Sequence, residues 1–247
     1  MSESSVIASL GKPMIRDPRT TSLDLHAHLR RLITSGALAP GTILKQAELA
    51  RIFEVSRTPL REAFRMLQEE GLIEADLNQR PRVRGLDADE LDQLYASRIA
   101  LEALGARVTT DRLSADEIEE GRSLLRRMDE ARGDQAMPEW LGLHRRFHQI
   151  CTARAGGPLA RAISSYGEQS ERYLLTYQAW HPDSFARAHR EHVAILRAVG
   201  GSDSMLSGCL MAEHLSHTAM TVLRDLSADL PARAVVQALA MVSGTLD

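Results

Sequence analysis

Histidines are the residues of this chain whose type and spacing could do chemistry. Seven of the nine lie after residue 140. His144 and His148 are four residues apart, so on a helix both side chains project from one face and can bind one metal ion. His192 and His214 lie in two later segments, each with a further histidine about one turn away. Facing helices of a bundle can bring such side chains together, and imidazole suits zinc, nickel, copper or iron.

Each of these histidines, taken alone, has a simpler interpretation as a helix-surface residue or a hydrogen-bonded core residue. Burying several unpaired imidazoles costs free energy, because each ring carries a polar donor and a polar acceptor. A metal ion removes that cost by taking one nitrogen of each ring while neighbouring groups take the other. Three or four histidines around an ion would leave room for a carboxylate ligand to complete its shell.

A second group of residues could contact nucleic acid. The sequence SRTPLRE at 56–62 has the character of a helix start, because Ser56 or Thr58 can cap it and proline is tolerated in a first turn. Arg57 and Arg61 are four residues apart and project from one face, where a guanidinium can bind guanine through two hydrogen bonds. The hydroxyls of Ser56 and Thr58 suit phosphate. The alternative is a surface helix with solvated arginines.

The elements around these arginines complete a recognisable order. Apolar residues at spacings of three and four begin at Leu23, and GALAPG at 36–41 ends that helix. A short helix over about 46–53, a turn at 54–56 and a helix over about 57–70 follow. LIEAD and RVRGL, around NQRP, indicate two short strands and a tip. This order predicts a winged helix-turn-helix, whose second helix enters the major groove of DNA.

Beyond about Asp87 the pattern is helical throughout and predicts an antiparallel bundle. SADE at 114–117 is a capping box, and GGSD at 200–203 ends one helix and caps the next. GGP at 156–158 and HPDS at 181–184 are further breaks. The expected helices lie near 88–112, 115–131, 137–154, 158–179, 183–199, 203–226 and 231–243.

Composition and charge fit a two-part globular protein of 247 residues with 44% hydrophobic residues. Residues 1–86 carry 13 Lys and Arg against 10 Asp and Glu, a net +3, and the remainder carries 17 against 23, a net −6. A mildly basic part joined to an acidic one suits a nucleic-acid-binding module on another domain. Because no apolar run could span a membrane, no secretory signal is evident and the two cysteines form no framework, we expect a cytoplasmic protein.

The expected fold class is therefore mainly α, with an N-terminal winged helix-turn-helix and a C-terminal antiparallel α-helical bundle. We divide the chain into a flexible N-terminal arm over 1–19, a DNA-binding domain over 20–86 and an all-helical ligand-binding and dimerisation domain over 87–247. These boundaries follow the change from strand and turn signals to uninterrupted helical periodicity near residue 87.

The DNA-binding part resembles a known family. APGTIL, followed by ELARIFEVSRTPLREAFRMLQEEGLIE, is similar to the GntR family of bacterial regulators over about residues 22–86. The family usually has glycine at the wing tip, where this chain has NQRPR, so the tip either adds a minor-groove contact or belongs to a reshaped wing. The resemblance implies DNA contacts from arginines of the helix-turn-helix and from a wing at 78–82: Arg51, Arg57, Arg61, Arg80 and Arg82.

The helical part carries a second resemblance. RIALEALGARV, HRRFHQI, EHVAIL and MAEHL resemble the FCD ligand-binding domain of one GntR subfamily, over about residues 88–226. This domain is similar to an antiparallel bundle that often holds a metal through one Asp and three His. Carried over, the histidine ligands fall on His148, His192 and His214, and the acidic ligand falls on His144. An all-histidine site is one charge unit more positive, which favours an anionic effector. Zinc is the expected ion, with nickel or manganese as alternatives.

The same resemblance implies an effector cavity. Arg98 would face that cavity, where its guanidinium could hold a carboxylate. The alternative is a plain helix ion pair between Arg98 and Glu102, which are four residues apart. Tyr173 and Trp180, seven apart on one helix, either line the cavity or serve as core aromatics.

The sequence thus predicts a DNA-binding transcriptional regulator, and it favours a repressor over an activator. It would act as a homodimer on a pseudo-palindromic operator and respond to a small organic acid bound beside a metal. One alternative is the same regulator without metal, binding an apolar or acyl ligand. Another is a hydrolase in which a histidine-bound metal activates water, although no general-base carboxylate accompanies HRRFH.

Overall fold

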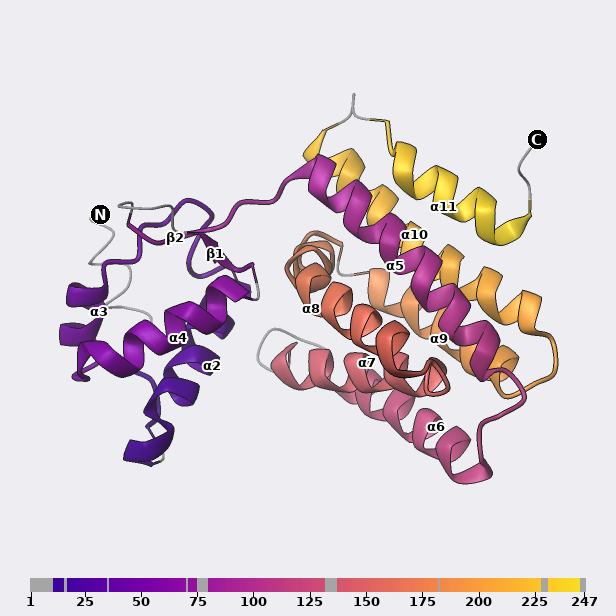
Figure 1. Cartoon of the computed structure of the whole chain (residues 1–247), viewed down its shortest axis with the longest axis horizontal. Coiled ribbons are helices and arrows are strands. Elements are labelled where there is room, and N and C mark those ends of the chain that lie inside the picture. Colours follow the sequence, from indigo (N-terminus) through magenta and orange to yellow (C-terminus); the bar gives the residue numbers. More distant parts are fainter. Residues whose placement is uncertain are drawn as a thin grey trace. The chain divides into compact units, whose positions relative to one another are not determined.

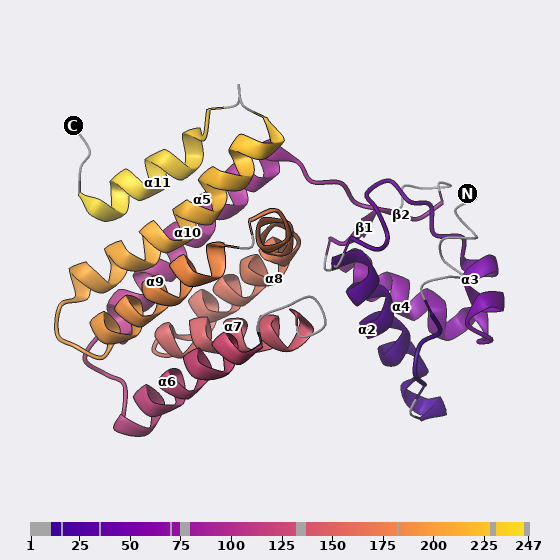
Figure 2. The ribbon, with the colours of Figure 1, turned by 180° about the vertical axis from the view of Figure 1, so that it is seen from behind.

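The computed structural model divides into two compact units, Met1–Leu86 and Asp87–Asp247, which we call the head and the body (Figures 1 and 2). The predicted mainly α fold, with a winged helix-turn-helix and a helical bundle, is confirmed. Among the described residues, no helix is both long and apolar enough to cross a membrane. The structure describes residues 11–15, 17–34, 36–69, 71–74, 80–131, 137–181, 183–227 and 231–244.

The head contains three α-helices and a small two-stranded sheet within its described residues. Its strands are antiparallel, with Ile73 opposite Val83 and Glu74 opposite Arg82. Glu54, between the second and third helix, has a φ of 58°, in the left-handed region that a tight turn needs. The elements are the 3-10 turn η1 (Pro18–Thr20), α2 (Thr21–Thr34), α3 (Gln46–Ile52), α4 (Arg57–Glu69), β1 (Ile73–Glu74) and β2 (Arg82–Val83).

One apolar face of α4 seats it on the head. Leu60, Phe64 and Leu67 recur at spacings of three and four and are at most 1% exposed. They share a core with buried leucines of α2, including Leu25 and Leu29. Because this face is buried, the arginines on the other side of α4 are held toward solvent.

The N-terminal arm differs in part from the expected flexible segment over 1–19. Pro13 is buried and Ile15 packs against the core of the head. Lys12 Nζ lies 2.6 Å from Glu54 Oε1 in the turn before α4. Pro13 and Ile15 therefore lie against the head, because burial of their apolar side chains offsets the entropy lost on ordering them, while the exposed ion pair adds little. The expected arm over 1–10 and the wing tip over 75–79 lie outside the described residues.

The body is a bundle built around one long central helix. The helix α5 packs against α8, α10 and α11, while α6 packs against α7 and α9, so two helical layers meet in the core (Figure 1). The elements are α5 (Ala88–Thr109), α6 (Ala115–Glu130), α7 (Met137–Cys151), α8 (Gly157–Trp180), α9 (Ser184–Val199), α10 (Ser204–Leu226) and α11 (Arg233–Ser243).

Helix starts in the body follow the predicted capping signals closely. The Ser114 side chain accepts from the Glu117 amide while the Glu117 side chain accepts from the Ser114 amide, which is the expected capping box. Asp203 caps α10 by accepting from the amide of Leu206. Two helix ends were predicted three residues too late: α5 stops at Thr109, before Asp111 with its φ of 63°, and α7 stops at Cys151.

Candidate functional site

The four predicted histidines meet in the core of the body. His144 and His148 come from one face of α7, His192 from α9 and His214 from α10. One ligand atom from each residue lies within 4.8 Å of the others, and no member of the cluster is more than 7% exposed. The i, i+4 spacing on α7 places two rings side by side, with centroids 4.5 Å apart. We call these four residues the histidine cluster.

The orientation of the rings fits a shared cation. His192 Nε2 lies 3.1 Å from His214 Nε2, so these two nitrogens face one another. His148 Nε2 is buried and has no hydrogen-bond partner among the described residues. Leaving a buried imidazole nitrogen unpaired costs about 1–3 kcal/mol. A divalent ion accepting lone pairs from these nitrogens would remove that cost, so the residues present fit the metal that the FCD resemblance implies.

Two carboxylates hold the opposite nitrogens of two rings. Glu102 Oε2, from α5, lies 2.7 Å from His148 Nδ1, and Glu191 Oε2, from α9, lies 2.8 Å from His214 Nδ1. When Nδ1–H donates a hydrogen bond to a carboxylate, the neutral ring carries its lone pair on Nε2, the nitrogen that faces the cluster. Both rings are thus prepared as ligands.

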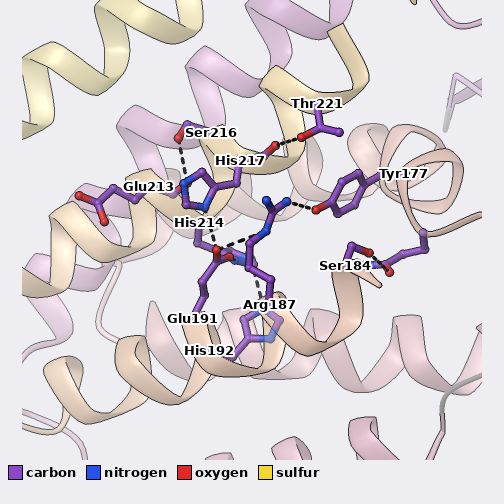
Figure 3. A network of polar contacts seen from close by, with 11 residues as sticks. Tyr177, Ser184, Arg187, Glu191, His192, Glu213, His214, Ser216, His217 and Thr221 are labelled. Atoms are coloured by element: carbon purple, nitrogen blue, oxygen red, sulfur yellow. Dashed lines mark hydrogen bonds and ion pairs between the residues drawn. The ribbon is translucent and has the colours of Figure 1, made fainter. Parts of the chain in front are cut away.

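Glu191 also connects the cluster to the surface, as Figure 3 shows. Its Oε1 lies 2.7 Å from Nδ1 of the half-exposed His217 and 3.6 Å from Nε of Arg187. The Arg187 guanidinium in turn contacts the hydroxyl of Tyr177 on α8 (Figure 3). A polar chain therefore runs from the buried His214 through α9 to the end of α8.

Burial favours the metal-binding form of three members of the cluster, His144, His192 and His214. Desolvation, followed by repulsion from neighbouring histidines, lowers the pKa of His144 and of His192 well below the usual value. Burial also lowers the pKa of His214, although the hydrogen bond to Glu191 opposes the shift. A neutral imidazole has a lone pair to give to a metal, whereas a protonated one does not.

A cavity of about 400 Å³ adjoins the histidine cluster between α5, α7 and α8. His144 and His148 form part of its wall, together with Arg98 and Glu102 from α5. The remaining wall is mixed and includes the charged residues Arg145, Arg146 and Glu171 as well as polar and apolar side chains. The apolar lining comprises Ala153, Ala155, Ala160, Ile163 and Leu174.

Arg98 satisfies both of its predicted descriptions. It lines the cavity and is 5% exposed. Its Nε and Nη2 both lie 2.7 Å from Glu102 Oε1, and its Nη1 donates to Ser170 Oγ at 2.9 Å. Burial works to raise the pKa of Glu102, but the charge of Arg98 and the contacts with His148 outweigh it and lower the pKa to about 2. Both members of the ion pair are therefore charged at neutral pH.

Tyr173 is one of the two aromatic residues that the sequence assigned either to the cavity or to the core, and it lies in the core. Tyr173 is fully buried, donates its hydroxyl proton to the Asp87 carbonyl oxygen at 3.0 Å and does not line the cavity with Arg98. Its spacing along α8 did not reveal that it ties α8 to the start of α5, so the core alternative describes it. The side chain of Trp180 lies outside the described residues.

The candidate DNA-binding face is the start of α4 with the end of α3. Ser56, Arg57, Thr58 and Arg61 are exposed around the first turn, and Arg51 is exposed on α3. None of these arginines forms an ion pair with a described residue. By contrast, the guanidinium of a later arginine on the same helix, Arg65, contacts both Glu62 and Glu69. The first turn of α4 thus presents uncompensated positive charge and a helix N-terminus, which together suit DNA phosphates and bases.

The wing arginines differ from each other. Arg80 is exposed at the edge of the undescribed tip. Arg82, on β2, donates from Nε to Glu74 Oε1 at 2.6 Å across the strand pair. Contact of Arg82 with a phosphate would therefore compete with an existing ion pair.

Sequence reasoning did not find Glu191 and treated Glu102 only as a partner of Arg98. Each carboxylate lies on a different helix from the histidine that it contacts, so no spacing within one helix reveals the contact. Glu102 lies among the buried residues of α5, within a segment rich in Ala, Leu and Ile, and an acid at such a position was the available signal.

Two protein families match the chain. The FCD domain matches residues 93–217, and the family described as bacterial regulatory proteins, gntR family, matches residues 21–83. This protein is a GntR-family regulator with an FCD domain. The GntR and FCD resemblances seen in the sequence are thus confirmed. The family consists of DNA-binding transcriptional regulators, so the hydrolase alternative falls away.

Individual relatives agree with this assignment. The Nta operon transcriptional regulator of Aminobacter aminovorans is 38% identical over 158 residues, covering 63% of this chain and 72% of the relative. The HTH-type transcriptional repressor RspR of Escherichia coli is 27% identical over 196 residues, covering 78% and 85%. The solved structure of E. coli McbR/YncC is similar in fold, with a TM-score of 0.68, 21% identity and coverage of 87% and 100%.

Proposed function

We propose that this GntR-family regulator controls transcription from an operator in response to a small carboxylate bound beside a divalent metal. The observation that carries the proposal is the histidine cluster, whose four ligand atoms lie within 4.8 Å of one another. Two of its members, His144 and His148, line a cavity together with Arg98. His148, His192 and His214 would hold the ion, with His144 as a fourth ligand. Four neutral imidazoles suit zinc or nickel better than manganese.

The chemistry of the cavity supports a carboxylate effector. A bound divalent ion would supply positive charge and a coordination position. Arg98, already oriented by Glu102 and Ser170, would bind a carboxylate through its remaining N–H groups. The apolar side chains of the wall would accept a short hydrocarbon part. The volume of about 400 Å³ suits a metabolite rather than a long acyl chain.

On DNA, we propose that Arg51, Arg57 and Arg61 contact the operator, with Ser56 and Thr58 at phosphates and Arg80 and Arg82 at the minor groove. Exposure and the lack of ion pairs with described residues support this role for the first three. The regulator would act in the cytoplasm as a homodimer. We propose that the protein represses transcription and that the effector relieves this repression. A relative named as a repressor supports repression over activation.

The experiment that tests the metal is a reconstitution. Wild type, His148→Ala and His192→Ala are stripped with chelator, reloaded with zinc, nickel or manganese, dialysed and analysed for metal content and melting temperature. We expect about one ion per wild-type chain, higher melting with metal, and loss of both effects in the two variants. His189→Ala is the matched control, because His189 lies on α9 beside Asp129 and outside the cluster.

Wild type that takes up none of the three ions, and whose melting never changes with chelator, would contradict the metal proposal. The second candidate would then be the same regulator with a metal-free cavity for an apolar or acyl ligand. The apolar part of the cavity wall is the observation that favours it.

A further inference from the structure

We propose that Glu102 is a positioning residue that couples Arg98 in the cavity wall to the metal ligand His148. This inference rests on the metal and effector site proposed above. Through Glu102, the metal affinity of His148 would depend on whether Arg98 binds Glu102 or another anion.

The geometry divides the Glu102 carboxylate between two partners. Glu102 is 1% exposed, so water does not compete for its oxygens. Its Oε1 receives Nε and Nη2 of Arg98, both at 2.7 Å. Its Oε2 lies 2.7 Å from His148 Nδ1. One buried carboxylate thus forms the shared link between a cavity side chain and a ring of the histidine cluster.

Both partners must donate, and this requirement makes the carboxylate necessary. Arginine has five N–H donors and no acceptor. His148 must donate from Nδ1 if its buried Nε2 is to present a lone pair to a metal. A glutamine has one acceptor and one donor end, so whichever way its amide turns, the NH₂ group faces either Arg98 or the His148 Nδ1 proton.

Coupling follows from sharing one negative charge. An anion that binds Arg98 weakens the hold of the guanidinium on Glu102 Oε1. The charge of Glu102 is then available to His148, which strengthens the imidazole as a ligand. Because linkage is reciprocal, a metal on His148 favours anion binding at Arg98 by the same factor.

Glu119 provides a comparison outside the histidine cluster. It is an exposed acid on α6, and its carboxylate contacts Arg122 and Arg126 rather than a histidine. It does not line the cavity that contains Arg98. Glu119→Gln therefore removes one carboxylate charge without changing a partner of a metal ligand.

The test is the affinity for Ni²⁺ alone, measured by calorimetry on chelator-stripped full-length protein. We expect Glu102→Gln to bind Ni²⁺ about 10–100-fold more weakly than wild type and Glu119→Gln to remain close to wild type. Equal Ni²⁺ affinity in wild type and Glu102→Gln would overturn the inference. Failure of wild type to bind any Ni²⁺ would instead contradict the metal proposed above, so the two failures are distinguishable.

A double-mutant cycle with Arg98→Met separates positioning from a general structural role. Without the guanidinium, the NH₂ group of the glutamine no longer opposes a donor and its oxygen can turn to His148. We therefore expect Arg98→Met to raise Ni²⁺ affinity by about tenfold or more in the Glu102→Gln background and by a smaller factor in wild type. The same factor in both backgrounds would overturn the coupling.

If Glu102→Gln alone does not fold, Arg98→Met is compared with Arg98→Met/Glu102→Gln. Both proteins keep an acceptor on His148 and neither has a donor opposite it, so they differ only in the charge at position 102. We expect the double variant to bind Ni²⁺ less than about tenfold more weakly than Arg98→Met. A double variant at least about tenfold weaker than Arg98→Met would contradict the inference. Melting curves of the stripped proteins establish that each compared variant is folded.

Discussion

At the residue scale, the arginines of α4 differ in whether a nearby carboxylate neutralises their charge. Arg57 and Arg61 are exposed on the first turn of α4, whereas the guanidinium of Arg65 already contacts Glu62 and Glu69. We expect Arg57→Ala and Arg61→Ala each to cost about 1–3 kcal/mol of specific DNA binding. The measurement is a binding titration on a duplex selected from a random pool by the wild-type protein, at fixed salt.

Arg65→Ala is the control for this prediction, because it removes a positive charge from the same helix at a place where that charge is neutralised within the protein. We expect binding close to wild type. If Arg57→Ala and Arg61→Ala bind the selected duplex as Arg65→Ala does, α4 does not read the DNA.

His28 makes the stability of the head sensitive to pH. The ring is 7% exposed and packs edge-on against Phe53, with centroids 5.4 Å apart. Burial, followed by the nearby charge of Arg31, lowers its pKa below 6.5. As the pH falls, His28 is protonated in the unfolded chain before it is protonated in the folded head. The contribution of the neutral ring to the free energy of unfolding is therefore present above pH 6.5 and is lost as the pH falls toward the lowered pKa.

We therefore expect the wild-type protein to lose stability between pH 7.5 and 5, by at most about 1.4 kcal/mol per pH unit from this residue. His28→Gln removes the titrating group and should flatten that part of the profile for the head transition. Denaturant melts at several pH values measure both proteins. Parallel profiles for wild type and variant would show that His28 does not contribute.

Single-residue roles were predictable from sequence where a motif or a helix spacing encodes them. The i, i+4 pair His144 and His148 follows from helix geometry, and the motif resemblance adds His192 and His214. Glu191 was missed because its partners lie on another helix, at separations of 23 and 26 residues. Contacts of that kind depend on how helices cross, which periodicity does not specify.

At the element scale, the close crossing of α5 with α7 and α8 depends on a glycine, Gly105. A Cβ on Gly105 would lie 2.9 Å from Thr152 Cγ2 and 3.0 Å from Ile163 Cδ1. Thr152 is β-branched and stiff at χ1, so it has little freedom to move aside. We expect Gly105→Ala to destabilise the body by about 1–2 kcal/mol, because overpacking exceeds the gain in helix propensity.

Gly142 supplies the matched control for that substitution. It lies within α7, is exposed, and a Cβ there would meet no atom within 4 Å. Gly142→Ala should therefore stabilise by about 0.5–1 kcal/mol through helix propensity alone. Chemical denaturation of both variants measures the two signs. Stabilisation by Gly105→Ala would show that the helices can separate at no cost.

Helix starts were more predictable from sequence than the space between helices. Ser114 and Asp203 announce α6 and α10 because capping is a local interaction within four residues. The cavity beside the histidine cluster had no comparable local signal. Its wall combines residues from three helices, and a seven-residue spacing along α8 does not indicate whether Tyr173 reaches it.

At the scale of the whole molecule, the chain joins a GntR-type head to a helical body that contains an FCD domain. The head supplies one recognition helix, α4, whose first turn can contact only a few base pairs. The body carries the histidine cluster and cavity on seven helices within its described residues. The proposed effector control would require the body to alter how the head binds DNA. In a dimer, the distance between the two recognition helices is the quantity that it could change.

This reasoning predicts a homodimer that binds two half-sites on one face of the duplex. Sedimentation of the metal-loaded protein at micromolar concentration should give twice the 27.3 kDa chain mass, and two chains should bind per selected duplex. Recognition helices of a dimer engage half-sites whose centres lie about 10 base pairs, or a multiple, apart. Inserting about 5 base pairs between the half-sites turns one of them by half a helical turn, so binding should fall to the level of a single half-site. Undiminished binding to that duplex, or a monomer with and without DNA, would mean that each head acts alone.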